Sequence, residues 1–412
     1  MDQGPSKGFH DVSLMSHDRR LRGRPRLCSD CGLCDSFLRP RMAETCLFVR
    51  NRAEEIEQRL HGRRRRPGDE LRFGIFREQG VMRMRRPVAG AQWTGMVTTL
   101  AARLLERGEV EAVILAGTNP GTRFEPRPVL ARTPEEARAC AGNKPSLAPN
   151  LTLLDAVRDS AIRRLALVGT GCQVQILRQA EPELGLERLD LIGLPCSDNV
   201  TYTDQQLFLS TISRSPETVV HYEFMQDFSL WLTHEDGHRE RVDYIDFPMD
   251  RLQGIFPSAC LSCFDYPNTL SDITIGYLGA PLGWQWVLAR TARGLELLNL
   301  LRPDLETRPV SEAGDRTRGM PRFIQMLARR PARPPWLVRR LIAFLQRRRG
   351  PRGLEFARAI IEMKLLRNLT HVREKFPANE ARIVPYHVYE TLKPYAEAYR
   401  QVFGREPGPP SP

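Results

Sequence analysis

Two kinds of hydrophobic pattern alternate along the middle of this chain. Continuous apolar runs indicate buried strands, and apolar residues at helical spacing indicate amphipathic helices. The expected strands are residues 71–78, 80–88, 110–117, 163–169 and 189–195. The expected helices are residues 90–108, 133–140, 150–161 and 172–184, and Thr133 followed by acidic residues is a helix-capping pattern. Strands that alternate with helices predict a parallel sheet covered on both faces.

The pattern changes after residue 204. A helix at 204–213 is followed by strands with alternating polarity at 218–225, 228–237 and 238–246, and an Asp-Gly pair between the last two predicts a hairpin. Two more strands are expected at 271–280 and 284–291, and the chain is mostly helical from residue 294 onward. The chain therefore combines a parallel-sheet region, a β-rich region and a helical C-terminal region.

Eight of the nine cysteines have an arrangement typical of iron–sulfur ligation. Cys28, Cys31 and Cys34 show the C-x2-C-x2-C spacing that begins a ferredoxin-type [4Fe–4S] site, and such a site often takes its fourth thiolate from elsewhere. The other candidate ligands are Cys46, Cys172, Cys196, Cys260 and Cys263. Eight thiolates would hold two clusters, and the spacing leaves open which cysteines share a cluster.

Zinc and disulfides are the alternative uses of these cysteines. Cys260 and Cys263 match one half of a zinc site, but the third cysteine of the first run has no role around a single tetrahedral ion. The first twenty residues show no export signal, so we expect a cytoplasmic protein, in which structural disulfides are rare. Cys140 stands apart on a predicted helix and is expected to be a small packed residue.

The predicted sheet gives two of the downstream cysteines a position. Cys172 and Cys196 each follow a predicted strand, and ligands collect beyond the carboxyl ends of the strands in an open parallel sheet. The start of a helix also favours the thiolate form of Cys172. A dinucleotide fingerprint fails here because Val174 occupies its third glycine position. No generic motif indicates a nicotinamide or a flavin.

The charge of the chain indicates an acidic partner. The net charge is +12, and arginine supplies nearly all the positive charge because only five lysines are present. No signature of a nucleic-acid-binding module accompanies the arginines, so we expect an acidic electron carrier such as ferredoxin rather than nucleic acid. Solvated surface arginines are the alternative. The predicted helix at 336–346 is apolar on one face and arginine-rich on the other, which is typical of a packed surface helix or of one that rests on a membrane.

Several longer stretches resemble one family. VGTGCQVQILR, NKPSLAPN, VHYEFMQDF and SCFDYPNTLSDITIGYLGAP are similar to the beta subunits of coenzyme F420 hydrogenases and dehydrogenases. GAQWTGMVTTLA, PVLARTPEE, SRSPETVVHYEFMQDF and GYLGAPLGWQWVL resemble two chlorophyll-biosynthetic branches of it, the ferredoxin-dependent divinyl chlorophyllide a 8-vinyl reductases and the 7-hydroxymethyl chlorophyll a reductases. The resemblance covers residues 28–368. It implies FAD, two [4Fe–4S] clusters at the eight cysteines, reduced ferredoxin as donor and a tetrapyrrole substrate.

One stretch favours the vinyl reductases. The plant 7-hydroxymethyl reductases carry extra residues after the GYLGAP motif, whereas here Pro281 leads directly through LGWQW into VLART. We therefore expect an enzyme that reduces a carbon–carbon double bond in chlorophyll or bacteriochlorophyll biosynthesis. A 7-hydroxymethyl reductase and a non-catalytic electron-transfer subunit are the alternatives. The arginine-rich stretch at 61–74 and the PARPPW stretch depart from the family, and the oligomeric state stays open.

The resemblance also suggests residues for the flavin and for proton transfer. The expected flavin-binding residues are Gln92, Thr94, Gly95, Thr98, Asn143, Lys144 and Pro145. A lysine or a helix N-terminus there would stabilise reduced flavin or its phosphates, and the alternative for the GAQWTG stretch is a turn that caps a helix. The candidate proton donors are His221, Tyr222, Glu223 and Asp227. A strand with one solvated face explains the same polar run.

The combined prediction is an α/β (α+β) fold with a small N-terminal ferredoxin-like cluster unit, a central mixed, largely parallel sheet flanked by helices, and a helical C-terminal region. The expected segments are a flexible arm at 1–27, an iron–sulfur unit at 28–66, an α/β FAD and cluster domain at 67–200, a β-rich region at 201–293 that completes the cluster and substrate site, a helical region at 294–403 and a disordered tail at 404–412. Contact with the surface of a photosynthetic membrane is a further expectation.

Overall fold

The structure is a computed structural model. It describes residues 27–252, 254–313, 316–329, 333–349 and 353–410. The predicted arm therefore lies almost wholly outside the described residues, as do the last two residues of the predicted tail. Among the described residues, no helix combines the length and the apolar character needed to cross a bilayer.

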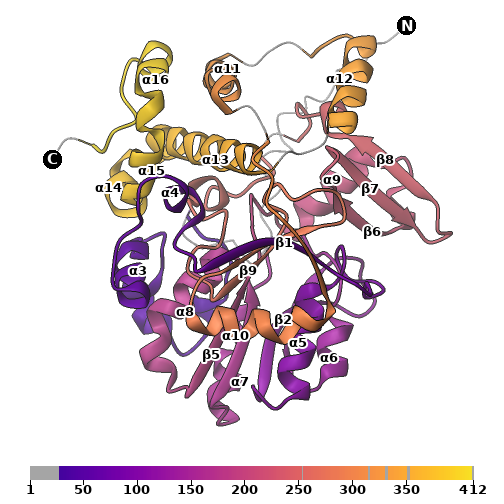
Figure 1. Ribbon diagram of the computed structural model, residues 1–412, viewed down its shortest axis with the longest axis vertical. Helices are drawn as coiled ribbons and strands as arrows, with labels where there is room; N and C mark the ends of the chain where they lie inside the picture. The colour runs from indigo at the N-terminus through magenta and orange to yellow at the C-terminus, as the bar shows by residue number, and fades with distance from the viewer. Residues whose placement is uncertain (1–26, 253, 314–315, 330–332, 350–352, 411–412) are drawn as a thin grey trace, which may run out of the picture.

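An eight-stranded mixed sheet forms the centre of the molecule (Figure 1). Its strand order is β11-β1-β10-β9-β5-β4-β2-β3. The strands are β1 (Glu78–Met84), β2 (Ala112–Thr118), β3 (Pro126–Ala131), β4 (Arg164–Gly169), β5 (Arg188–Gly193), β9 (Ile273–Gly276), β10 (Gln285–Ala289) and β11 (Leu305–Arg308). Strands β2, β4, β5 and β9 pair in parallel, and the remaining pairs are antiparallel. The prediction of a mixed sheet with helices around it is confirmed.

Helices cover both faces of this sheet. The α-helices of the sheet region are α2 (Met42–Thr45), α3 (Ala53–His61), α4 (Asp69–Phe73), α5 (Met96–Glu106), α6 (Pro134–Ala139), α7 (Leu154–Asp159), α8 (Gly171–Leu184) and α10 (Ala292–Leu301). Helices α5, α6 and α10 share one apolar core with the strands, whereas α3, α7 and α8 share another. The nearly continuous apolar sequences of β4 and β5 fit burial on both faces.

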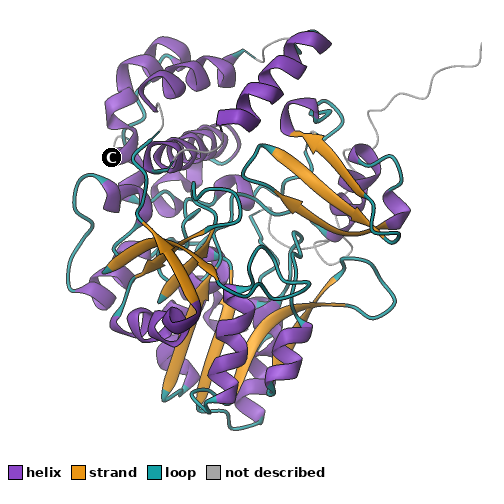
Figure 2. Cartoon of the chain, turned by 45° about the vertical axis from the view of Figure 1, so that its right-hand side comes forward, coloured by secondary structure: helices purple, strands orange, loops and turns teal. Residues whose placement is uncertain are grey.

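A second, three-stranded sheet stands apart from the first (Figure 2). It consists of β6 (Val219–Phe224), β7 (Ser229–His234) and β8 (Arg239–Asp243), all antiparallel. Helix α9 (Tyr202–Ile212) packs on it and closes a separate small core. The predicted hairpin is confirmed, because Gly237 adopts a left-handed φ of 81° between β7 and β8.

The C-terminal region is helical, as predicted. It contains α11 (Arg316–Ala328), α12 (Trp336–Arg349), α13 (Leu354–Lys375), α14 (Glu380–Ile383), α15 (Tyr386–Leu392) and α16 (Ala396–Phe403). Helix α13 is buried along most of its length and packs on the core that includes β1 and β10. This region therefore forms a layer across one end of the central sheet (Figure 1).

Three local predictions differ from the structure. Residues 71–78 were expected to be a strand, but Leu71–Phe73 belong to α4, whose acidic first turn begins at Asp69 and which ends at Gly74 with φ of 75°. Strands β3 and β11 were not predicted. Both are edge strands, and the prolines of β3 and the charged residues of β11 hide the strand pattern. The Thr133 capping box, in contrast, is confirmed.

Candidate functional site

Four cysteines from the N-terminal segment line one pocket, which we call the outer cysteine pocket. Cys28, Cys31, Cys34 and Cys46 all face this pocket, whose volume is about 760 Å³. Short 3-10 turns shape the loop, and Gly32 makes its tightest bend with φ of 97°. A side chain at Gly32 would collide with the backbone at residues 149–152, so only glycine allows the loop to approach the sheet there.

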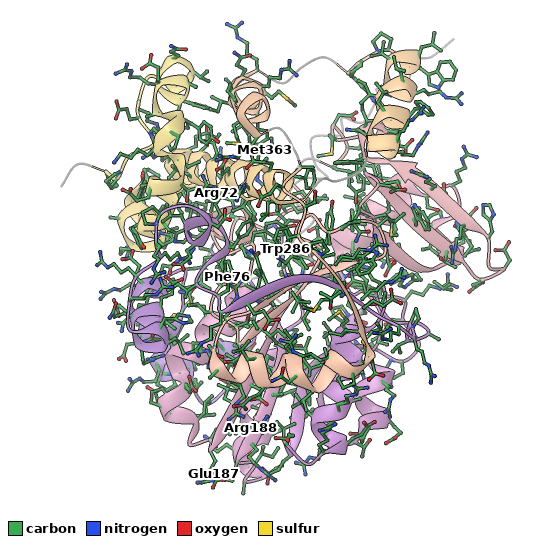
Figure 3. The ribbon with its side chains drawn as sticks, viewed as in Figure 1. Arg72, Phe76, Glu187, Arg188, Trp286 and Met363 are labelled. Carbon is green, nitrogen blue, oxygen red and sulfur yellow. The ribbon has the colours of Figure 1, made fainter. Side chains whose placement is uncertain are left out.

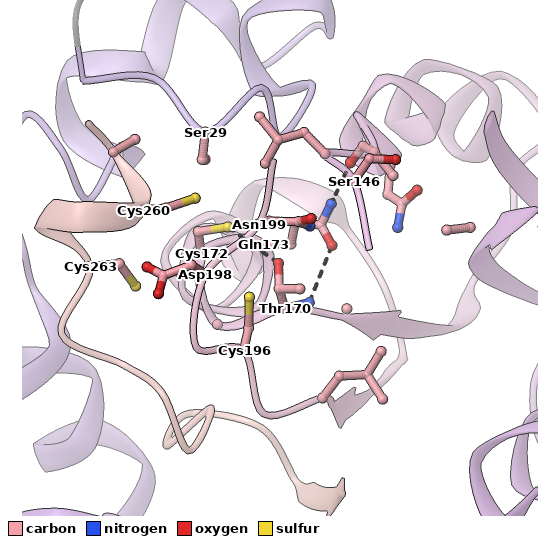
Figure 4. A pocket seen from close by; sticks show the side chains of 18 of the residues that line it. Ser29, Ser146, Thr170, Cys172, Gln173, Cys196, Asp198, Asn199, Cys260 and Cys263 are labelled. Atoms are coloured by element: carbon pink, nitrogen blue, oxygen red, sulfur yellow. Dashed lines mark hydrogen bonds between the residues drawn. The ribbon is translucent and has the colours of Figure 1, made fainter. Parts of the chain in front are cut away.

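The other four cysteines line a second pocket, the inner cysteine pocket (Figure 4). Cys172 lies in the first turn of α8, directly after β4, and Cys196 lies in the loop after β5. Cys260 begins the 3-10 turn η7 (Cys260–Ser262), and Cys263 follows that turn. Strands β4 and β5 pair in parallel, with Gly169 opposite Gly193. Cys172 lies three residues after Gly169, and Cys196 lies three residues after Gly193. The sheet register therefore brings these two sulfurs to the same edge.

That edge lies in the interior of the molecule. Arg188 marks the amino end of β5 at the outer end of the sheet, and Met363 of α13 lies at the opposite end (Figure 3). The carboxyl ends of the strands therefore point toward the C-terminal helical layer. The inner cysteine pocket lies beyond these strand ends, which is where ligands collect in an open parallel sheet.

Helix α13 holds the inner cysteine pocket together. The Asn368 side chain is fully buried and its amide nitrogen donates to the carbonyl oxygens of Cys260 and Cys263, at 3.1 and 2.6 Å. Lys364 forms an ion pair of 3.1 Å with Asp198 and donates to the Ser197 carbonyl, two contacts beside Cys196. These contacts fix the two loops that carry three of the four thiols.

The two cysteine pockets are neighbours. Ser29 and Phe48 line both of them, and Phe48 is buried. Burial raises the pKa of the Cys31 thiol well above its usual value, and the nearby Cys172 raises it further, so a sulfur of each group acts on the other. The distribution of the eight cysteines, which the spacing left open, is four and four in this structure.

The chemistry of the donor set fits an iron–sulfur cluster in each pocket. Burial raises the pKa of Cys260 and of Cys263 to about 12, and it also raises the pKa of Cys196, which the neighbouring Cys260 raises further. Bare thiols here would stay protonated, whereas iron binds thiolates and supplies the compensating charge. The described residues contain no group of three His, Cys, Asp or Glu side chains set around a single metal ion. In a [4Fe–4S] cluster each iron takes one thiolate, so the ligands spread around a larger body.

A third pocket, the polar pocket, lies next to the inner one and has a volume of about 660 Å³. Its lining includes Asn143 and Lys144 among the predicted flavin residues and His221 and Glu223 among the predicted proton donors. The His221 Nε2 atom lies 3.5 Å from Glu223 Oε1, and that oxygen accepts a hydrogen bond of 3.2 Å from the Trp93 backbone N–H. The structure therefore brings the predicted flavin residues Asn143 and Lys144 together with the predicted proton donors, which lie about 80 positions later in the sequence.

Lys144 lines both the polar pocket and the inner cysteine pocket. Its Nζ atom donates to the carbonyl oxygens of Cys140, Ala141 and Gly142. Burial lowers the pKa of Lys144 to about 8, and the nearby Cys140 opposes this shift. The three pockets thus form a series in which each shares lining residues with the next.

The other predicted flavin residues do not line the polar pocket. Thr94 is buried, and its hydroxyl accepts from the Met84 N–H and donates to the Gln285 side chain. Gly95 caps α5 with φ of 81°, as the alternative interpretation of a capping turn requires. Thr98 faces a separate small pocket. Gln92 and Pro145 are adjacent in sequence to lining residues but are not part of the lining themselves.

Two of the four candidate proton donors also lie elsewhere. The Tyr222 hydroxyl is buried in the small core of the three-stranded sheet, where it accepts a hydrogen bond of 2.8 Å from Gln205, and burial raises its pKa. Asp227 forms an ion pair of 2.8 Å with Arg241 and accepts a hydrogen bond from Ser229. Alternation along β6 explains this result, because His221 and Glu223 share the face opposite to Tyr222.

Sequence reasoning missed several residues of the polar pocket. Trp93, Arg123, Trp231 and Arg239 line it, and Trp93 has a left-handed φ of 53° and a buried indole nitrogen without a partner among the described residues. Trp93 lies inside the GAQWTG stretch that resembles the family, so the sequence could have indicated this residue as part of the pocket. Arg123 lies in a polar loop, and Arg239 begins β8 in a polar, exposed sequence, so neither residue stands out from an ordinary solvated surface. Cys140 packs at the end of α6 as a small core residue, as predicted.

Comparison with known proteins identifies relatives along most of the chain. Residues 81–155 match the model "Coenzyme F420 hydrogenase/dehydrogenase, beta subunit N-term", and residues 162–313 match the corresponding C-terminus model. An uncharacterised protein of Nostoc sp. is 43% identical over 91% of this chain and 96% of its own length. The chloroplastic 7-hydroxymethyl chlorophyll a reductase of Oryza sativa is 40% identical over 90% of this chain and 82% of its own length.

A solved structure shares the fold. A chain in the xenon-derivatised F420-reducing [NiFe] hydrogenase complex from Methanosarcina barkeri superposes with a TM-score of 0.59 at 23% identity, covering 76% of this chain and 96% of that one. The named relatives are hydrogenase, dehydrogenase and reductase proteins, which are oxidoreductases. The chain belongs to the coenzyme F420 hydrogenase/dehydrogenase beta subunit family.

Proposed function

We propose that this protein is a ferredoxin-dependent iron–sulfur flavoenzyme that reduces the 8-vinyl group of a divinyl chlorophyllide or protochlorophyllide to an ethyl group. One observation carries the proposal: two four-cysteine pockets and a polar pocket adjoin in series, through Ser29 and Phe48 and then through Lys144. Such a series suits an oxidoreductase that takes single electrons at one end and reduces an organic substrate at the other.

Two [4Fe–4S] clusters would be held by the four thiolates of each cysteine pocket. The outer pocket is the natural site of electron input, because Arg39 and Arg382 belong to its lining and are both exposed. Among the described residues neither arginine has an ion-pair partner, and both would offer their charge to an acidic partner. Reduced ferredoxin would dock there by charge complementarity.

The polar pocket is the proposed place for FAD and the substrate. Bound FAD would supply the conversion of single electrons into a two-electron reduction. Asn143 donates to the Tyr222 carbonyl and thereby fixes one wall of the pocket. The Lys144 ammonium lies where it would stabilise negative charge on a reduced cofactor. His221, with Glu223 beside it, would deliver the proton that the new ethyl group requires.

The test combines cofactor analysis with turnover. Protein purified without oxygen should contain iron, acid-labile sulfide and flavin, and reduced ferredoxin should drive conversion of divinyl chlorophyllide a to its 8-ethyl product. We expect H221A to lower turnover by about 10²-fold while ferredoxin still reduces the flavin. H238A, in the exposed hairpin, is the matched control. A protein that accepts electrons but converts no tetrapyrrole would instead be an electron-transfer subunit.

The second candidate is reduction of a 7-hydroxymethyl group on chlorophyll a. The similarity to the Oryza sativa reductase, 40% identity across 90% of this chain, favours it. The direct connection from Pro281 to β10 favours the vinyl reductase instead. Parallel assays with divinyl chlorophyllide a and 7-hydroxymethyl chlorophyll a decide between them, because the two products differ in mass and absorption.

A further inference from the structure

Helix α12 exposes its apolar side chains to solvent. It lies at the edge of the molecule beside the three-stranded sheet (Figures 1 and 2). Its exposed apolar residues are Trp336, Leu337, Val338, Leu341, Phe344 and Leu345, with exposed fractions from 37% to 69%. Soluble proteins rarely leave contiguous apolar patches of this kind uncovered unless the patch meets a partner.

The opposite face of α12 is held to the protein by charge. Arg339 forms an ion pair of 2.7 Å with Asp246, and Arg347 forms one of 2.7 Å with Asp243. Ala343, which lies between these arginines, is buried. Residues 339, 343 and 347 are four positions apart, so they occupy one face of the helix.

This orientation is the reverse of an ordinary surface helix. An amphipathic helix normally buries its apolar stripe and exposes its charged face. Here the acidic residues of β8 and the following turn attract the arginines inward, and the apolar stripe is left outward. The exposed stripe is thus a consequence of two specific ion pairs rather than of a loosely attached helix.

We propose that the outward face of α12 binds the surface of an anionic lipid bilayer. Its leucines, phenylalanine and tryptophan are the residues that insert at the boundary between headgroups and acyl chains. Arg340 and Arg348 are exposed beside the stripe and form no ion pair with a described residue, and the Arg340 guanidinium lies 5.1 Å from the Trp336 ring. The helix contains no acidic residue, and the chain carries a net charge of +12. The positive charge of the helix and the positive net charge of the chain both suit anionic headgroups.

The inference goes beyond the proposed function and does not depend on it. Helix α12 contributes no residue to the three pockets. It does contact the end of the three-stranded sheet through the ion pair between Arg347 and Asp243 of β8.

The experiment is flotation of the full-length protein with vesicles made of equal parts phosphatidylcholine and phosphatidylglycerol. We expect the wild type to float with these vesicles at low salt. The double variant L337S/L341S should bind about tenfold more weakly, because it removes two inserting side chains. The variant R340Q/R348Q should lose its preference for phosphatidylglycerol over pure phosphatidylcholine. M326S, an exposed apolar position on α11, is the control and should bind like the wild type.

Other occupants of the patch give different results. All the substituted side chains are exposed, so each variant should keep the wild-type melting temperature. Unchanged flotation of L337S/L341S would overturn the proposal, as would a wild type that does not float. A wild-type dimer that L337S/L341S converts to a monomer, without any change in flotation, would identify the patch as a contact between copies of the chain. Turnover is not needed for any of these measurements.

Discussion

The two cysteine pockets hold the same number of thiols but are built in different ways. The outer pocket takes all four cysteines from nineteen consecutive residues, Cys28 to Cys46. The inner pocket takes its cysteines from three segments spread over ninety-two residues, Cys172 to Cys263, and the central sheet and α13 bring these segments together. The first is local in sequence, and the second is a product of the fold.

Because of this difference, the two pockets depend on different structural features. The outer pocket needs a loop that bends tightly, which Gly32 allows, and exposed arginines in its lining. The inner pocket needs the parallel register of β4 and β5 and the buried amide of Asn368. Loss of a cysteine at the outer pocket should therefore remove electron input, and loss of a cysteine at the inner pocket should remove the whole centre.

The largest effect is expected from C196A. It removes one of the four thiols from the pocket in the middle of the proposed series, so ferredoxin-driven turnover should be abolished, and iron content should fall by about half. Iron analysis, flavin content and turnover measure the outcome. C140A, which removes the cysteine outside both pockets, is the control and should keep full iron content.

C34A should be less damaging. It opens the outer pocket, so about half of the iron and the ferredoxin-driven activity should be lost. The inner pocket stays intact, and a small chemical reductant should still drive turnover in C34A but not in C196A. Equal loss with both electron donors in both variants would contradict the division into an outer input and an inner relay.

The double variant R39Q/R382Q should have a smaller effect. Both side chains are exposed at the outer pocket, so the KM for ferredoxin should rise about three- to tenfold while kcat stays the same. The salt dependence of kcat/KM should also become weaker. R405Q, near the C-terminus, alters an exposed arginine away from the pocket and serves as the control.

N368A should affect stability more than turnover. The substitution leaves the carbonyl oxygens of Cys260 and Cys263 buried without their donor, which costs about 1–3 kcal/mol in the free energy of unfolding. Denaturant titration measures this loss. T370V removes a hydrogen bond within the same helix and should cost less, since its partner carbonyl keeps its helical bond. Equal losses in the two variants would mean that Asn368 has no special role at the inner pocket.

Much of the sheet and the set of eight cysteines could be predicted from the sequence. Strands β4 and β5 are continuous apolar runs, and the spacing of Cys28, Cys31 and Cys34 is a local signal. The partition of the cysteines could not be predicted, because it depends on the order of strands in space. The proton-donor candidates show the same limit: alternation separates His221 from Tyr222, but only the packing of α9 decides which of them faces the polar pocket.

Helix α12 illustrates a different limit. The sequence shows that it has an apolar face and an arginine-rich face. It does not show which face packs, because that depends on Asp243 and Asp246, about a hundred residues earlier in the chain. The spacing of the residues defines an apolar face and a charged face of the helix, but the residues packed against the helix determine which face is exposed.

Ser29 and Phe48 have a consequence for how the protein matures. Each lies one or two positions after an outer-pocket cysteine, and each is also a wall of the inner pocket. The segment that carries the outer cysteines therefore also forms part of the wall of the inner pocket. If both pockets hold clusters, as proposed, we expect the inner cluster to be inserted before the outer cluster fixes this segment in place.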